Sequence, residues 1–155
     1  MKLDGASKKV AAAWPLEGCE SPSGMAIDRA KHRLFSVCDG GKMAVLDYQS
    51  GKMLGVANIG NSPDAAGFDP RYKIAFSSNG GDGTLTIVDA NRAEFPVIQT
   101  LKTGKGARTM AFDALTGRIY LVTATFATVS GADATAPPRR PSILPDSLEI
   151  LVVDR

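Results

Sequence analysis

The sequence predicts an all-β chain, and three observations support that prediction. A block of about 40–45 residues recurs, and an aspartate closes the first apolar strand of each block at Asp28, Asp69 and Asp113. Short apolar runs within each block are separated by turns of Gly, Asn and Asp. No apolar run keeps a helical period over the length of a helix. Such blocks are typical of β-propeller blades, so we expect a partial β-propeller of four-stranded antiparallel blades.

Each block predicts the same succession of strands. A short inner strand is followed by a turn in which Asp stands with Arg, Pro or Gly, and three further strands complete the sheet. The expected strands are 24–27, 33–38, 42–46 and 53–59; then 65–68, 73–78, 84–88 and 97–101; then 109–112, 118–123 and 148–153. Apolar residues on both faces of many strands indicate sheets that pack face to face. A β-sandwich also has regularly spaced short strands, but it does not predict the recurring block.

The repeats divide the chain, as one unit over 1–155, into about three blade-equivalents. We expect a lone fourth strand at 8–16, blades at 21–60 and 61–104, and a blade over 105–155 that lacks its fourth strand and carries an insert at 128–146. Closed propellers have typically about four to eight blades. The N-terminal strand of one copy would complete the last blade of another. Two copies would then close a six-bladed ring with two-fold symmetry.

This division predicts a homo-oligomer, most simply a dimer, since open blade faces and unpaired strand edges promote association. The alternative is that the sequence is a piece of a longer gene product without a function of its own. The insert is rich in Pro, Ala and Ser, which is typical of an extended loop, and its position also suits a lid or a partner-binding arm.

Composition excludes several classes of function. A net charge of +2 with 22% charged residues is too balanced for a nucleic-acid-binding surface. No run approaches the roughly 18 apolar residues of a membrane span, and the N-terminus has no apolar core of a signal peptide. Two cysteines without CxxC spacing and a single histidine, His32, argue against a zinc site. We predict no cofactor, no metal ligand and no catalytic residue.

Three segments resemble the YVTN-type β-propeller repeat family. They are Arg33–Asp47, Phe76–Asp89 and Ile119–Ala124, and the resemblance extends over nearly the whole chain apart from the insert. It implies a propeller fold and a parent protein of the periplasm or cell surface, although this chain shows no export signal. The family is similar to lactonase-like and haem d1-binding propellers, but no catalytic motif of theirs is matched here.

Ligand sites in a propeller usually lie at the channel mouth, where the loops before the inner strands meet the loops between the second and third strands. Arg108 is suited to a carboxylate or phosphate, with Asp64 setting its orientation. The alternative is a structural ion pair that lines a water-filled channel. The candidate ligand-binding residues at this mouth are Ser23, Asp39, Asp64, Asn79, Arg108 and Thr123.

Other polar features have simpler interpretations. The segment 77–84 (SSNGGDGT) reads as a turn, and a calcium loop is a weaker alternative because Asn79 and Asp82 supply too few oxygen ligands. Cys19 precedes an inner strand and Cys38 ends the strand beside it. A disulfide between them is therefore feasible, and two packed thiols are the alternative.

The sequence thus favours a non-enzymatic binding or scaffold module that acts on an unknown small molecule or protein. The alternative is a lactonase-like hydrolase with its site at the channel mouth. Such an enzyme generally needs a cage of carboxylates with a histidine, or a general base near a nucleophile. The predicted mouth offers few carboxylates and no histidine, which favours binding.

Overall fold

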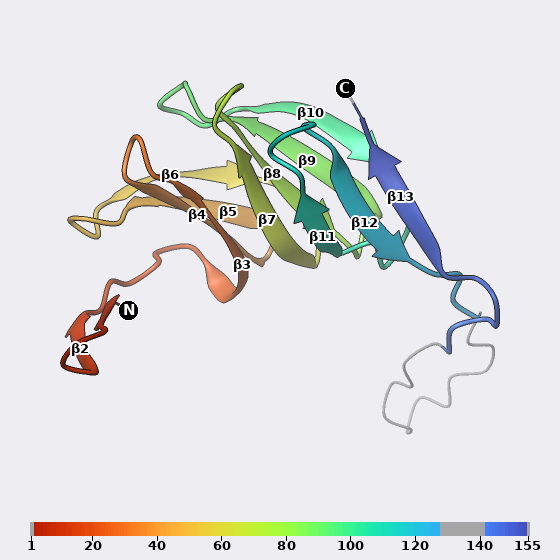
Figure 1. Cartoon of the computed structure of the whole chain (residues 1–155), viewed down its shortest axis with the longest axis horizontal. Helices are drawn as coiled ribbons and strands as arrows, with labels where there is room; N and C mark the ends of the chain where they lie inside the picture. The colour runs from red at the N-terminus through yellow and green to blue at the C-terminus, as the bar shows by residue number, and fades with distance from the viewer. Residues whose placement is uncertain (1, 128–141, 155) are drawn as a thin grey trace.

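The computed structural model describes residues 2–127 and 142–154, and every regular element within those ranges is a β-strand. Three antiparallel sheets follow one another along the chain and fan out side by side, with a small hairpin at the N-terminal end (Figure 1). This confirms the predicted all-β, propeller-like fold. None of the described segments is a helix that is long and apolar enough to cross a membrane.

Sheets 1 and 2 are four-stranded meanders. Their strands are paired in chain order, as the repeat predicts for a blade. Sheet 1 consists of β3 (Glu20–Asp28), β4 (Arg33–Asp39), β5 (Lys42–Asp47) and β6 (Met53–Asn58). Sheet 2 consists of β7 (Pro63–Asp69), β8 (Ile74–Asn79), β9 (Thr84–Asp89) and β10 (Val97–Lys102).

Sheet 3 has three strands among the described residues. They are β11 (Thr109–Phe112), β12 (Ile119–Thr123) and β13 (Glu149–Val153). The segment 128–141, which makes up most of the expected insert, lies outside the described residues. The residues that flank it meet, because Phe126 and Ile143 form an antiparallel bridge. The base of the insert is therefore closed beside β12.

The N-terminal hairpin differs from the lone strand expected over 8–16. Its strands are β1 (Lys2–Asp4) and β2 (Lys9–Ala12), and they pair antiparallel. The physical reason is that β1 supplies backbone partners for an edge that would otherwise be unpaired. Beyond β2 the chain crosses sheet 1, and the indole of Trp14 lies against Gly51.

Two apolar clusters hold the sheets together, one at each sheet-to-sheet interface. The first lies between sheets 1 and 2, where the ring of Phe35 stacks on Phe68 with centroids 5.4 Å apart. The second lies between sheets 2 and 3, where Phe76 meets Phe112 edge to face at 5.0 Å. An aromatic ring of one second strand thus packs on an aromatic ring of the next inner strand at both interfaces.

A buried ion pair reinforces the first interface. Arg33 donates Nη2 to Asp28 Oδ2 at 2.6 Å and Nη1 to the carbonyl oxygen of Ala90 in the next sheet at 2.6 Å. The side chains of Arg33 and Asp28 are 7% and 5% exposed. The guanidinium also lies over the rings of Phe35 and Phe95. Arg33 therefore connects sheet 1 to sheet 2 through a buried contact.

The outward faces of sheets 1 and 3 expose apolar side chains. On sheet 1, Met25 is 56% exposed and Ile27 is 38% exposed. On sheet 3, Ile150 is 70% and Val152 is 53% exposed. Met43 and Val45, which correspond to Ile150 and Val152, are fully buried between sheets 1 and 2. Ala66 and Phe68, which correspond to Met25 and Ile27, are partly buried against the same cluster, so the two end faces have the composition of an interface.

Candidate functional site

The structure brings Asp64 and Arg108 together, as expected for neighbouring blades. The Nε atom of Arg108 lies 3.9 Å from Oδ2 of Asp64, and the two side chains are 63% and 41% exposed. An ion pair of this length and exposure contributes little to stability. The guanidinium of Arg108 is consequently accessible to an anion from solvent.

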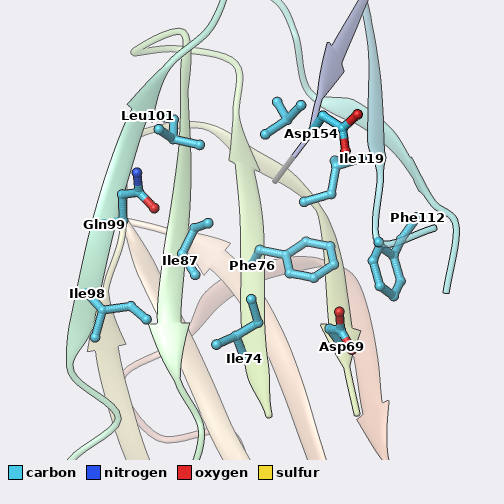
Figure 2. A pocket seen from close by; sticks show the side chains of 12 residues that line it. Asp69, Ile74, Phe76, Ile87, Ile98, Gln99, Leu101, Phe112, Ile119 and Asp154 are labelled. Atoms are coloured by element: carbon cyan, nitrogen blue, oxygen red, sulfur yellow. The ribbon is translucent and has the colours of Figure 1, made fainter. Parts of the chain in front are cut away.

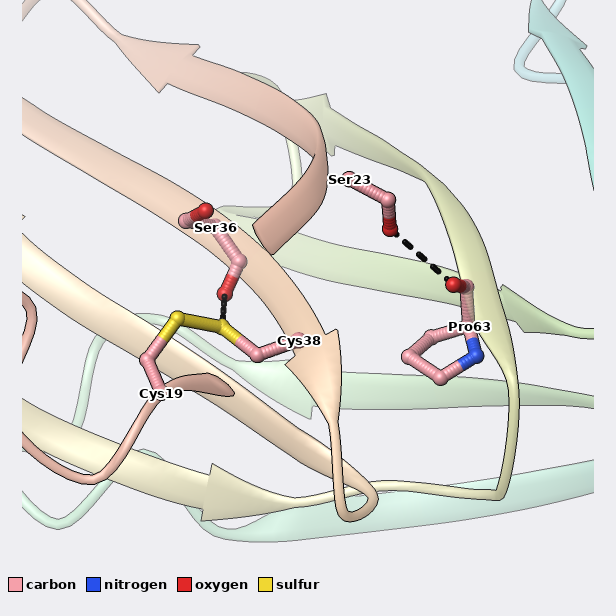
Figure 3. Close-up of a disulfide and its surroundings, with 5 residues drawn as sticks. All are labelled: Cys19, Ser23, Ser36, Cys38 and Pro63. Carbon is pink, nitrogen blue, oxygen red and sulfur yellow. Dashed lines mark hydrogen bonds between the residues drawn. A yellow bond between two sulfur atoms is a disulfide. The ribbon is translucent and has the colours of Figure 1, made fainter. Parts of the chain in front are cut away.

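Ser23 and Thr123 hold backbone segments at this end of the sheets. Ser23 donates Oγ–H to the carbonyl oxygen of Pro63 at 3.0 Å, which links β3 to the next inner strand (Figure 3). Thr123 donates its hydroxyl to the carbonyl oxygen of Lys105 at 2.8 Å. Both hydroxyls therefore have structural partners within the chain.

Asn79 differs most from its expected place at the mouth, because it is fully buried. Its amide nitrogen donates to Thr86 Oγ1 at 2.9 Å, and its amide oxygen accepts a hydrogen bond from Ser77 at 2.9 Å. Every residue of β8 is buried, so this side chain cannot turn to solvent. Asp39, in contrast, is exposed at the end of β4.

The loop between β8 and β9 is a turn that is tied to the preceding connection. Asn61 donates its backbone N–H to Asp82 Oδ2 at 2.7 Å and its side-chain amide to Oδ1 at 3.1 Å. The backbone hydrogen bond, which has the larger effect, and the side-chain hydrogen bond both hold the pKa of Asp82 below its ordinary value. Gly83 takes a φ of 64°, which the turn requires. Within residues 2–127 and 142–154, no three His, Cys, Asp or Glu side chains are grouped to hold a metal ion.

Cys19 and Cys38 form a disulfide, the alternative that the sequence left open (Figure 3). Their Cα atoms are 5.3 Å apart, within the usual range for a disulfide. The bond fixes the segment before β3 to the end of β4. The connection that carries Trp14 is thereby fastened to sheet 1.

An apolar cavity of about 260 Å³ lies between sheets 2 and 3. Figure 2 shows Leu101 and Gln99 on one side and Ile119 and Asp154 on the other, with Phe76 between them. The cavity adjoins β13, at the place where a fourth strand of sheet 3 would pack. No sequence motif marks this cavity, and the only local signal for it is that the third block has three strands in the described part of the chain.

A second recess lies on the outward face of sheet 1. It has a volume of about 610 Å³ and is lined by Lys2, Trp14, Ile27, Leu34, Tyr48 and Gln49. Residues from the N-terminal hairpin, β3, β4 and the loop after β5 contribute to it. No sequence motif marks this recess, because its lining comes from segments that only the fold brings together.

The fold is similar to that of several solved proteins. Hydrazine synthase from Kuenenia stuttgartiensis gives a TM-score of 0.71 at 15% identity, over 81% of this chain and 36% of its own. A luciferin-regenerating enzyme gives 0.49 at 12% identity, over 75% and 40%. The β-propeller domain of Cps50 (Swd1) from Myceliophteria thermophila gives 0.45 at 14% identity, over 99% and 64%. No protein-family model and no curated protein matches the chain.

At these identities the likeness shows the fold alone, and activity does not follow from fold. The chain spans about a third of the hydrazine synthase chain to which it is similar.

Proposed function

We propose that the protein is a non-enzymatic binding or scaffold module, of YVTN-type repeats, that closes a propeller ring by association of two copies. The observation that carries this proposal is the pair of exposed apolar faces. Val152 on β13 corresponds in register to Val45 on β5, which is fully buried between sheets 1 and 2. Since the exposed fraction of Val152 is 53%, a sheet-sized partner would bury it as Val45 is buried.

The outward faces of sheets 1 and 3 are both apolar, so they can pack on each other. Sheet 3 would present its outward face to the outward face of sheet 1 of a second copy, repeating the contact that each sheet already makes with the next. Two copies would make that contact twice, which closes a ring with two-fold symmetry and leaves no apolar face exposed.

Strand exchange would complete the last blade of each copy. In the hairpin, Leu3 pairs with Val10, and the register shifts between Lys2 and Leu3. In sheet 1, Leu46 pairs with Met53, and the register shifts at the matching place, between Val45 and Leu46. β1 thus has the place of a third strand and β2 that of a fourth. We propose that β13 of one copy replaces β1 beside β2 of the other. The cavity beside β13 supports this, since an incoming strand would cover it.

A complementation experiment tests the ring. Ile150→Lys would block the outward face of sheet 3, and Met25→Lys would block that of sheet 1, while both side chains are exposed enough for the fold to tolerate the change. Each variant alone should be a monomer by light scattering, because every contact it makes has one blocked face. An equimolar mixture should recover dimers through its one intact contact.

Leu115→Lys serves as the matched control, since Leu115 is 90% exposed in a turn that belongs to neither face. It should remain dimeric like the unaltered protein. A monomeric unaltered protein at micromolar concentration, or a mixture that stays monomeric, would refute the ring.

We also propose that the mouth binds an anionic ligand through Arg108, oriented by Asp64. The exposed guanidinium and its long, weak ion pair support this. Titration with inorganic phosphate should shift the amide NMR signals next to Arg108, and Arg108→Gln should abolish the shifts. Arg92→Gln, at another exposed ion pair, should leave them unchanged. Shifts that persist in Arg108→Gln would contradict the site.

A further inference from the structure

Arg33 and Arg118 occupy the same position in their sheets. Arg33 lies opposite Asp28 in one ladder and opposite Asp47 in the other. In sheet 3, the pairs Phe112–Ile119 and Ile119–Val153 place Arg118 opposite Asp113 and Asp154 in the same way. The two arginines therefore project from the same face of equivalent strands.

Their surroundings differ in the carboxylate that each arginine binds, Asp28 for Arg33 and Asp154 for Arg118, and in the presence of a following sheet. Arg33 reaches that sheet and donates to the carbonyl oxygen of Ala90. Arg118 has no following sheet among the described residues, and it donates Nε to Asp154 at 3.0 Å with its side chain 46% exposed. Two positions further along, Tyr120 stands where Phe35 packs into the core.

The recess on the outward face of sheet 1 is lined by residues that match those around Arg33 and Phe35, so its lining suits Arg118 and Tyr120. Its Ile27 and Leu34 form a ladder pair that corresponds to the pair Phe68–Ala75, against which Phe35 packs. Its Tyr48 corresponds to Ala90: each residue directly follows the aspartate at the end of a third strand, and donates its N–H to the residue that precedes the second strand.

Trp14 is a further point of likeness between the recess and the interface of sheets 1 and 2. The ring of Phe95 lies beside Arg33 in the first interface. In sheet 1, the matching loop position is Gly51, and the indole of Trp14 lies directly against it. An aromatic ring therefore borders the recess at the place where Phe95 borders the contact inside the chain.

We infer that the recess lined by Ile27, Leu34, Tyr48 and Trp14 receives Tyr120 and Arg118 of a second copy of this chain. The inference rests on the proposed two-copy ring and names the contact that holds it closed. Arg118 would donate to the carbonyl oxygen of Tyr48 in the second copy, as Arg33 donates to Ala90. The ring of Tyr120 would pack on Ile27 and Leu34.

The first experiment measures the dimer dissociation constant by sedimentation velocity. Arg118→Met keeps an unbranched apolar stem and removes every hydrogen-bond donor, so we expect the dissociation constant to rise by about ten-fold or more. Arg118→Lys should recover only part of the loss, because one ammonium does not reproduce the forked geometry of a guanidinium. Arg92→Met, which removes an exposed arginine outside both faces, should leave the constant unchanged.

The second experiment tests for a cross-link between copies. Such a cross-link would not form if Arg118 only paired with Asp154 in its own sheet. A mixture of Arg118→Cys and Gln49→Cys variants should form a disulfide between copies on mild oxidation, because Gln49 adjoins Tyr48 in the recess. An Arg92→Cys and Gln49→Cys mixture should not.

The outcomes separate this inference from the ring itself. The inference would be overturned if the dimer dissociation constant were unchanged in Arg118→Met and the cysteine variants formed no cross-link. The two-copy ring would still stand in that case. A monomeric unaltered protein would overturn both.

Discussion

Asp47, Asp82 and Asp113 accept hydrogen bonds at turns, and each carboxylate is thereby favoured in its charged form. The main-chain N–H of Ser50 lowers the pKa of Asp47, and the hydroxyl of Thr116 lowers that of Asp113. Asp47 and Asp113 stand at the ends of strands in the repeat, whereas Asp82 lies in the turn between β8 and β9 and ties it to Asn61. The side chains of Asp47 and Asp113 close the turns that follow them, and this explains why a recurring aspartate marks each blade in the sequence.

The lowered pKa values predict acid sensitivity. A carboxyl whose pKa is lower in the folded state than its unfolded value of 3.8 stabilises the fold above that value. The contribution is lost as the pH falls through the lower folded pKa. The urea midpoint should therefore fall between about pH 5 and about pH 2. Asp82→Asn should flatten this fall, and an unchanged fall would contradict the assigned role of Asp82.

The strands β3 and β7 approach each other more closely than side chains would allow. A Cβ atom on Gly24 would lie 2.4 Å from the carbonyl oxygen of Asp64 and 2.8 Å from Cα of Ala65. Both atoms belong to the backbone and cannot move away cheaply. Gly24 thus permits the inner strands of adjacent sheets to pack together beside the proposed mouth.

Substitution of Gly24 tests this close approach. Gly24→Ala should lower the free energy of unfolding by about 1–3 kcal/mol, because the added methyl group overlaps the backbone of β7. Gly5→Ala is the matched control, since nothing lies within 4 Å of the corresponding Cβ position. Urea denaturation measures both. Equal midpoints for the two variants would show that the inner strands can separate without cost.

Neighbouring sheets bury each other at both interfaces of the molecule. The end faces repeat the same pattern of side chains, but among the described residues no further sheet packs on them. Phe35 and Phe76 are fully buried, whereas Val122, on the same strand as Tyr120, is 42% exposed. Association of the end faces would bury this apolar area and add stability in proportion to it.

If two copies form the folded unit, thermal stability must depend on protein concentration. The melting temperature of the unaltered protein should rise as its concentration increases from about 1 μM to about 100 μM, since mass action favours the folded dimer. The Ile150→Lys variant should melt at the same temperature throughout. A concentration-independent melting temperature in the unaltered protein would contradict an assembly coupled to folding.

The sequence by itself determined the all-β fold, the blade period and the place of most strands. These features are local: apolar runs, turn residues and recurring aspartates act within a few residues of one another. The expected strand 73–78 and β8, Ile74–Asn79, differ by a single residue at each end. The meeting of Asp64 and Arg108 also followed from the repeat, because equivalent positions of adjacent blades lie side by side.

Only the tertiary structure decided which polar residues are accessible and how the ends of the molecule are finished. Asn79 turned inward because its amide finds Thr86 across the ladder, and no local signal distinguishes that partner from a ligand. The disulfide between Cys19 and Cys38 and the recess beside Trp14 depend on segments that the fold brings together from different parts of the sequence. Such contacts are set by packing in three dimensions, which a one-dimensional pattern does not encode.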